Sequence, residues 1–324
     1  MAKPLDEQVV VITGASSGIG RETALRLAEK GAKVVASARR EEPLDDLVEE
    51  IKSRGGEAVS IPADVSVYEE VDALVQAAVS AYGRIDTWVN NAGVLLVSEF
   101  ENADLGEARR VFDVNFWGEY HGCKAVLPVM KRQGGGTIIN VSSVTAKRPL
   151  PLMSVYSASK AAINGLSEAL RAEIAETGVE LSIVMPATID TPLFEHARTK
   201  EGVAPKATPP IYPPSEVARA IEMCAVSPRR LVYAGPAGQM FAISNILAGG
   251  VLDRLLGAVR RPATLTTRPE PPRGEDNLQR PMPEAPATTE GGWRTARYKA
   301  FETASRVALV LGALLLARRL ARRS

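Results

Sequence analysis

The chain has 324 residues, of which 45% are hydrophobic and 24% are charged, and its formal net charge is +1. A chain of this length and composition can bury a full core, and its balanced charge gives no reason to expect nucleic-acid binding. Its two cysteines and two histidines, Cys123, Cys224, His121 and His196, lack metal-ligand spacing, so we expect a reducing compartment and no metal site. We expect a cytoplasmic protein, because no apolar targeting segment precedes the first predicted strand.

The first predicted elements are a buried strand at 9–12, a glycine-rich turn, and a helix over 21–30 that ends at Gly31. Glycines between a strand and a helix N-terminus let backbone N–H groups and the helix dipole approach a pyrophosphate. The spacing is G-x-x-x-G-x-G, and the alternative is a tight turn without a ligand. The residues expected at this end of a cofactor are Thr13, Gly14, Ser16, Ser17, Gly18, Ile19 and Gly20.

The second predicted strand, 33–38, contains Ser37 and leads into Arg39 and Arg40. An acidic residue at this distance from the glycines would bind the ribose 2′-hydroxyl of NAD. Two guanidinium groups suit a 2′-phosphate instead. We therefore favour NADP(H) over NAD(H); the alternative is a solvated pair of arginines at a strand end.

Strands and helices continue to alternate along the chain. This alternation predicts an α/β protein, a Rossmann-like doubly wound parallel sheet of about seven strands with helices on both faces. Ligands then bind at the carboxyl ends of the strands. Further strands are predicted at 58–61, 87–89, 137–141, 181–184 and 231–233, and further helices at 43–54, 68–82, 104–132, 154–177 and 215–226.

Tyr156 and Lys160 lie four residues apart in a predicted helix. Ser143 lies thirteen residues before Tyr156, directly after an apolar strand. Residues at i and i+4 share one helix face, so the phenol and the ammonium are neighbours. With a hydroxyl from the next strand they can move a proton to or from a carbonyl oxygen. The same spacing also occurs as an ordinary surface pair.

With these motifs the chain resembles the short-chain dehydrogenase/reductase family, of an NADP-preferring type with a C-terminal extension, over about residues 8–235. The resemblance implies cofactor contacts from Asp64 and Val65 after the third strand, from Asn91, Ala92 and Gly93 after the fourth, and from Pro186, Ile189 and Thr191 after the sixth. Ala187 stands where the family usually has glycine. The catalytic residues that the resemblance implies are Ser143, Tyr156, Lys160 and Asn115.

By this resemblance Tyr156 is the general acid in carbonyl reduction and the base in the reverse reaction. The Lys160 cation favours the phenolate and its ammonium binds the nicotinamide ribose. Ser143 would donate to the substrate oxygen, and Asn115 would hold a water that links Lys160 to solvent.

The expected function is hydride transfer between NADP(H) and a carbonyl/alcohol pair. A hydrophobic substrate is favoured, with a small polar one as the alternative, because the expected lining is apolar. A non-catalytic NADP-binding sensor or scaffold localised by its tail is the second reading, although such proteins usually lose the tyrosine, lysine or serine. The expected lining residues are Val94, Leu95, Leu150, Leu152, Met153 and Phe194.

The expected division of the chain is a catalytic domain at 1–260, a Pro-rich disordered linker at 261–292 and a basic, apolar helix at 293–324. The uncharged run 307–317 spans about 16 Å as a helix, short of a ~30 Å hydrocarbon core. We expect it to lie on an anionic membrane surface. Docking on its own domain or a partner, recruitment of a partner, and a disordered tail are alternatives. The apolar segment 240–256 is expected to be a flap or an interface, and a homodimer or homotetramer is expected from the resemblance.

Overall fold

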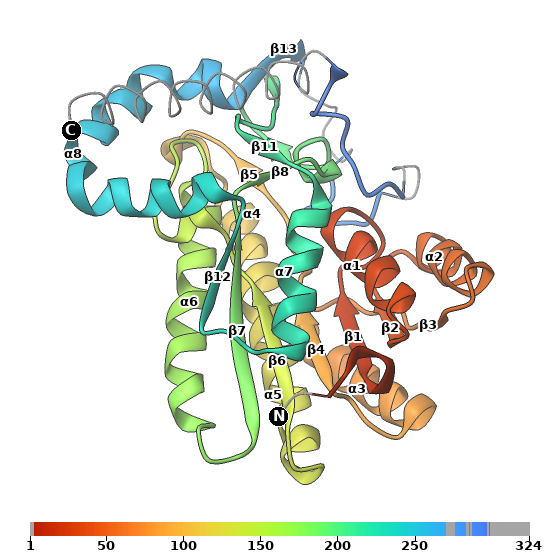
Figure 1. Cartoon of the computed structure of the whole chain (residues 1–324). Coiled ribbons are helices and arrows are strands. Elements are labelled where there is room, and N and C mark those ends of the chain that lie inside the picture. The colour runs from red at the N-terminus through yellow and green to blue at the C-terminus, as the bar shows by residue number, and fades with distance from the viewer. Residues whose placement is uncertain (1–2, 270–275, 283–284, 286, 297, 299–324) are drawn as a thin grey trace, which may run out of the picture.

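The structure is a computed structural model that describes residues 3–269, 276–282, 285, 287–296 and 298 (Figure 1). In this part of the chain seven parallel strands form one sheet in the order β12-β7-β6-β4-β1-β2-β3. The predicted doubly wound sheet is confirmed. The strands are β1 (Val9–Thr13), β2 (Lys33–Ser37), β3 (Glu57–Ser60), β4 (Thr87–Asn90), β6 (Gly136–Val141), β7 (Val179–Pro186) and β12 (Leu231–Ala234).

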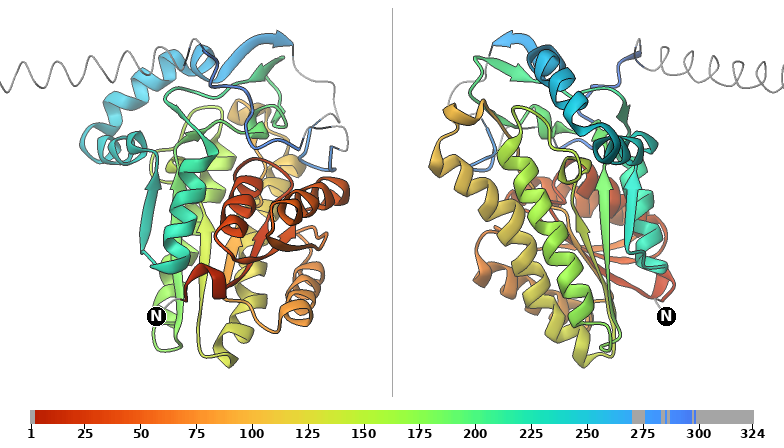
Figure 2. Two further views of the ribbon diagram at one scale, coloured as in Figure 1. Left: turned by 45° about the vertical axis from the view of Figure 1, so that its right-hand side comes forward. Right: turned by 90° about the vertical axis from the view of Figure 1, so that its left-hand side faces the viewer.

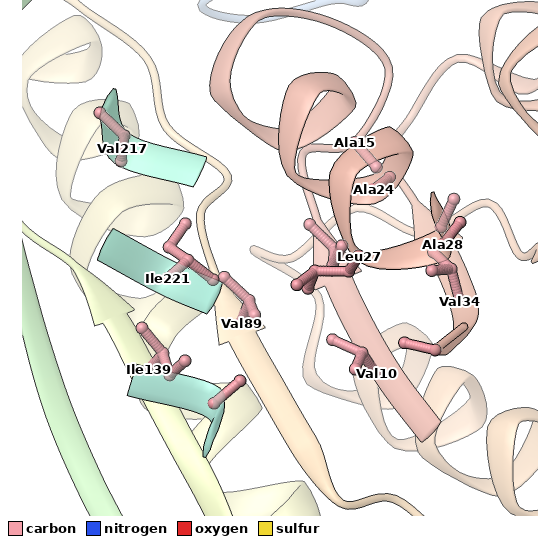
Figure 3. Packing of buried hydrophobic residues seen from close by; sticks show 14 of the residues in the cluster. Val10, Ala15, Ala24, Leu27, Ala28, Val34, Val89, Ile139, Val217 and Ile221 are labelled. Carbon is pink, nitrogen blue, oxygen red and sulfur yellow. The ribbon is translucent and has the colours of Figure 1, made fainter. Parts of the chain in front are cut away.

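Helices cover both faces of the sheet (Figure 2). Val10 and Ile12 of β1 pack in one core cluster with α1 (Gly18–Glu29), α2 (Glu41–Ser53) and α7 (Pro214–Val226). Figure 3 shows part of this cluster, with Val10 of β1, Leu27 of α1 and Ile221 of α7 labelled. Val9 and Val11 of the same strand pack in the second cluster. Because alternate residues of a strand point to opposite faces, a strand buried on both sides is apolar at every position. The second cluster includes residues of α3 (Tyr68–Tyr82) and α5 (Gly118–Arg132), and α6 (Ser154–Glu173) packs against it.

The segment predicted as one helix over 104–132 has three parts. Helix α4 (Leu105–Phe112) is capped by the Asp104 carboxylate, which accepts from the backbone N–H groups of Gly106 and Glu107. A π-helical turn at Asp113–Trp117 then leads into α5. Such π-turns are frequent at functional sites. The turn contains Asn115 and buries its side chain.

Short strand pairs surround the carboxyl ends of the sheet strands. They are β5 (Leu96–Val97) with β9 (Arg198–Thr199), β8 (Thr188–Ile189) with β11 (Ile211–Tyr212), and β10 (Val203–Pro205) with β13 (Leu265–Pro269).

Helix α8 (Pro236–Thr264) lies across this end of the molecule and is kinked at Ala248 (Figure 1). Much of its apolar surface is open to solvent; Ile246, for example, is 84% exposed. Among the described residues it is the one helix long and apolar enough to cross a membrane, a finding based on length and composition alone. Phe241 and Leu256 of α8 border a cavity at the carboxyl ends of the strands, which fits the expected flap over the pocket.

The described residues from 276 to 294 lie on the domain that the seven-stranded sheet forms, and we call them the C-terminal strap. This differs from the disordered linker expected over 261–292. Leu278 is fully buried, and the Asp190 carboxylate accepts backbone N–H groups from Gly291, Trp293 and Arg294. The buried Leu278 side chain and the hydrogen bonds to the Asp190 carboxylate thus anchor a stretch whose composition suggests disorder. The helix predicted at 293–324 lies largely outside the described residues.

Candidate active site

A cavity of about 470 Å³ lies at the carboxyl ends of the strands and joins the glycine turn to the Ser/Tyr/Lys set. Its size is that of a small-molecule or cofactor site. Thr13, Gly20, Ser37 and Asn115 are not among its lining residues. The sequence-predicted residues that line it are Gly14, Ser16, Ser17, Gly18, Ile19, Arg39, Arg40, Asp64, Val65, Asn91, Ala92, Gly93, Ser143, Tyr156, Lys160, Pro186, Ile189 and Thr191.

The glycines of the first turn are required by backbone conformation and by close contact. Gly14 has φ +68°, a left-handed value that favours glycine. At Gly20 an added Cβ would lie 2.3 Å from the carbonyl oxygen of Gly14. The turn therefore packs tightly against the first turn of α1, and the N-terminus of that helix opens at the cavity.

Thr13 and Asn91 join the glycine turn to the loop after β4. The Thr13 hydroxyl accepts the backbone N–H groups of Asn91 at 3.0 Å and Ala92 at 3.2 Å. The Asn91 amide donates to the backbone oxygen of Thr13 at 2.9 Å. Thr13 therefore supports the cavity from behind. Ser37 is also fully buried and does not reach the cavity.

Arg39 and Arg40 border the cavity from the end of β2, and both contact the strap. Arg39 Nη2 donates to the backbone oxygen of Asn277 at 2.6 Å, and Arg40 Nη1 donates to that of Ala285 at 2.5 Å. Burial lowers the pKa of both guanidinium groups, although they stay cationic at neutral pH. Arg39 Nη1 is buried and has no hydrogen-bond partner in the described part of the chain. This donor fits an anionic group bound in the cavity.

The Asp64 carboxylate, after β3, is held on one side of the cavity. It accepts from the Ser66 backbone N–H and hydroxyl, and from Arg110 Nη2 at 2.8 Å. Burial by itself raises the pKa of this carboxyl, but the bonds from Ser66 and Arg110 outweigh burial and lower it. Asp64 is therefore a fixed acceptor at neutral pH.

Ser143, Tyr156 and Lys160 come together on the same cavity. Ser143 follows β6, and its hydroxyl accepts from the Thr145 hydroxyl at 2.9 Å. Tyr156 is half-buried in the first turn of α6, and Lys160 lies one turn further on with only 3% of its surface exposed. The arrangement can deliver a proton to an oxygen placed beside Tyr156.

The Lys160 ammonium is held by two acceptors. Its Nζ donates to the backbone oxygen of Val141 at 2.8 Å and to Glu119 Oε1 at 2.9 Å. Sequence reasoning missed Glu119. The available signal was an acidic residue four positions after Asn115, on the face of the helix that also carries Gly122 and Cys123.

Asn115 uses its side-chain amide to fix the loop after β4. Its Oδ1 accepts from Val94 N at 2.9 Å, and its Nδ2 donates to Val94 O at 3.0 Å and to the Ser159 hydroxyl at 3.2 Å. The amide is fully buried. Its visible function is to position the cavity wall at Val94.

The part of the cavity beyond Tyr156 is apolar. Phe241 and Leu256 of α8 add to the expected residues, whereas Leu152 (φ 65°) is buried outside the lining. Among the described non-glycine residues, Leu152 is the one with a positive φ. Ala187, at the position where the family usually has glycine, therefore has an ordinary negative φ. The expected residues that line this part are Val94, Leu95, Leu150, Met153 and Phe194.

The strap forms one wall of the cavity near the glycine turn. Asn277, Met282 and Ala285 line the cavity, and the Gly18 N–H donates to the backbone oxygen of Thr288 at 2.9 Å. His196 also lines the cavity, and its backbone oxygen accepts the Asn277 N–H at 3.0 Å. Burial and the Arg40 charge lower the pKa of its imidazole to about 4. No sequence signal pointed to these strap contacts, because backbone carbonyls make them.

With fold and site in view, the chain belongs to the short chain dehydrogenase family, whose family model matches residues 8–202. It is thus an oxidoreductase by family. An uncharacterized oxidoreductase of Bacillus subtilis, YxnA, is 39% identical over 280 residues, 85% of this chain and 79% of the relative.

A curated dehydrogenase and a solved structure are also similar to this chain. The 3beta-hydroxysteroid dehydrogenase 1 of Eggerthella lenta is 39% identical over 195 residues, 60% of this chain and 75% of the relative. A solved short chain dehydrogenase/reductase from Burkholderia phymatum, in complex with NAD, has a TM-score of 0.70 and 28% identity, covering 77% of this chain and 96% of its own.

Proposed function

We propose that the protein is an NADP(H)-dependent oxidoreductase that transfers a hydride between the nicotinamide and a carbonyl/alcohol substrate. The observation that carries the proposal is the single cavity that connects the glycine turn with Ser143, Tyr156 and Lys160. If a dinucleotide binds in this cavity, its reactive ring would lie near the proton-transfer groups.

This chain's own groups would hold the dinucleotide. The N-terminus of α1 at Ile19, next to the Gly18 N–H that donates to Thr288, would face the pyrophosphate, and Asp64 and Val65 would lie at the adenine end. The unpartnered Arg39 Nη1 supports a 2′-phosphate and therefore NADP(H) over NAD(H). Pro186, Ile189 and Thr191 line the same cavity and would border the nicotinamide.

The reaction needs a hydride, which the nicotinamide supplies or accepts when bound. In carbonyl reduction the Tyr156 hydroxyl gives its proton to the substrate oxygen as the carbonyl carbon gains the hydride. Ser143 donates a hydrogen bond to the same oxygen, where negative charge develops. The Lys160 cation stabilises the Tyr156 phenolate that remains. In alcohol oxidation each step runs backwards, with Tyr156 as the base.

The substrate is proposed to be hydrophobic. Leu95, Met153 and Phe241 represent the apolar wall beyond Tyr156. A relative named for a hydroxysteroid agrees with this class. The sensor or scaffold reading is less well supported, because the serine, tyrosine and lysine are all present and share one cavity. The cytoplasmic location, the membrane contact of 293–324 and the homo-oligomer stay predictions from the sequence.

The test is NADPH oxidation with a panel of hydrophobic and polar carbonyl compounds, with NADH for comparison. In Tyr156→Phe we expect turnover to fall by at least about 100-fold, since general acid catalysis contributes that much, while NADPH binding stays within about twofold. Tyr82→Phe, on the distant α3, is the matched control and should keep full activity. Undiminished turnover in Tyr156→Phe would show that another group moves the proton.

A further inference from the structure

A buried carboxylate on α5 pairs with the lysine of the candidate active site. Glu119 Oε1 lies 2.9 Å from Lys160 Nζ, and the side chains are 2% and 4% exposed. A buried pair that loses one partner leaves an uncompensated charge, so the two groups depend on each other. Asn90 Nδ2 donates to the Glu119 backbone oxygen at 3.3 Å and ties this turn of α5 to the sheet.

We propose that Glu119 is a positioning residue of the reaction, which orients the Lys160 ammonium and offsets its charge beside Tyr156. The proposal rests on the proposed function, since it concerns the same proton-transfer site.

Counting donors explains the orientation. An ammonium has three N–H groups. Glu119 Oε1 and the Val141 backbone oxygen accept two of them, which leaves one for Tyr156 or a bound ribose. The carboxylate therefore restricts Lys160 to one direction, where a flexible lysine would sample several.

The charge effect follows from the same contact. Burial raises the pKa of Glu119 to about 7, with the Lys160 charge and hydrogen bond opposing the rise. Burial by itself lowers the pKa of Lys160, but the charges of Glu119 and Tyr156 outweigh it and raise that pKa. The Glu119 charge also acts on Cys123. Burial raises the pKa of this thiol to about 12, so it stays neutral. Above about pH 7 the Glu119 carboxylate is therefore an anion, and it opposes the effect of the Lys160 cation, which favours the Tyr156 phenolate.

Glu119 also has an oxygen without a partner. Its Oε2 is buried and makes no hydrogen bond in the described part of the chain. The free oxygen can carry the proton that this carboxyl gains near neutral pH.

The test is the pH dependence of kcat/KM for alcohol oxidation in Glu119→Gln. Alcohol oxidation requires Tyr156 as the base. The acidic limb of the kcat/KM profile therefore follows formation of the Tyr156 phenolate. The Tyr156 charge still raises the pKa of Lys160 in this variant and helps to keep it a cation. With the carboxylate removed this cation is unopposed, and we expect the limb to move to lower pH by about one unit. A limb that does not move, or that moves to higher pH, overturns the proposal.

Two variants separate this effect from lost stability. Glu107→Gln removes another buried carboxylate, which pairs with Arg198 at 2.9 Å and with Lys200 at 3.2 Å instead of with Lys160. We expect it to lower Tm without moving the limb. If Glu119→Gln does not fold, Glu119→Asp replaces it, with a smaller shift in the same direction because its carboxylate lies further from the ammonium. An unmoved limb in that variant likewise overturns the proposal.

A second readout works without turnover. Phenolate absorbance near 295 nm, with Tyr156→Phe as the baseline, follows ionisation of Tyr156 directly. We expect the phenolate to form at lower pH in Glu119→Gln than in the unaltered protein. If the protein reduces no carbonyl compound, the proposed function fails, and this titration still decides whether Glu119 acts on Tyr156. Equal titrations overturn the inference about Glu119.

Discussion

At the scale of single residues, the predicted site residues divide into those that border the cavity and those that support it. Thr13, Gly20 and Asn115 carry family motifs but make contacts with other protein groups. A motif identifies a residue that the site requires, and the contacts decide whether it touches a ligand or holds the backbone that does. Glu119 was missed because an acidic residue in a helix usually faces solvent.

Arg39 provides a test of cofactor preference at this scale. A hydrogen bond to a charged group contributes about 1.5–3 kcal/mol. We therefore expect Arg39→Ala to weaken NADPH binding by about 10- to 100-fold and NADH binding by less than about threefold, as measured by fluorescence titration. Arg219→Ala, at an exposed helix position, is the control. An equal loss for both cofactors would contradict a 2′-phosphate contact at Arg39.

At the scale of elements, the sheet strands and most helices could be predicted because each carries its own periodicity. The long helix over 104–132 was predicted without its π-turn, since an i→i+5 bond leaves no mark in the hydrophobic pattern. The strap was expected to be disordered because its composition is polar and rich in proline. A few long-range contacts, chiefly those of Leu278 and Asp190, hold it instead.

The strap covers part of the cofactor cavity, so cofactor release should depend on its anchor. Leu278→Ala removes a fully buried side chain, a change that costs about 2–5 kcal/mol in well-packed sites. We expect this cost to appear as local opening of the strap, with NADPH dissociation faster by about tenfold or more in stopped-flow fluorescence. Leu247→Ala, at a position 80% exposed, is the control. An unchanged dissociation rate would show that the strap does not limit release.

At the scale of the whole molecule, two core clusters enclose the sheet, and each of the two cysteines lies in one of them. Burial raises the pKa of both thiols, that of Cys123 to about 12. The thiolate is the reactive form, so both groups are protected while the fold is intact.

The thiols therefore report global unfolding. At pH 8 we expect neither cysteine of the native protein to react with Ellman's reagent within minutes, and both to react in guanidinium chloride. Because burial raises the pKa of both thiols, their protection from the reagent should end in one step when the protein unfolds. A thiol that reacts in the native protein would indicate that its cluster opens locally.

The sequence by itself determined the alternation of strands and helices, the glycine turn and the Ser143/Tyr156/Lys160 set. Local sterics, hydrophobic period and helix spacing encode these features within a few residues. Only the tertiary structure decided that Glu119 pairs with Lys160, that Arg39 and Arg40 contact the strap, and that Leu278 is buried. Those contacts join residues far apart in the chain, often through backbone carbonyls that every residue has, so no local pattern can specify them.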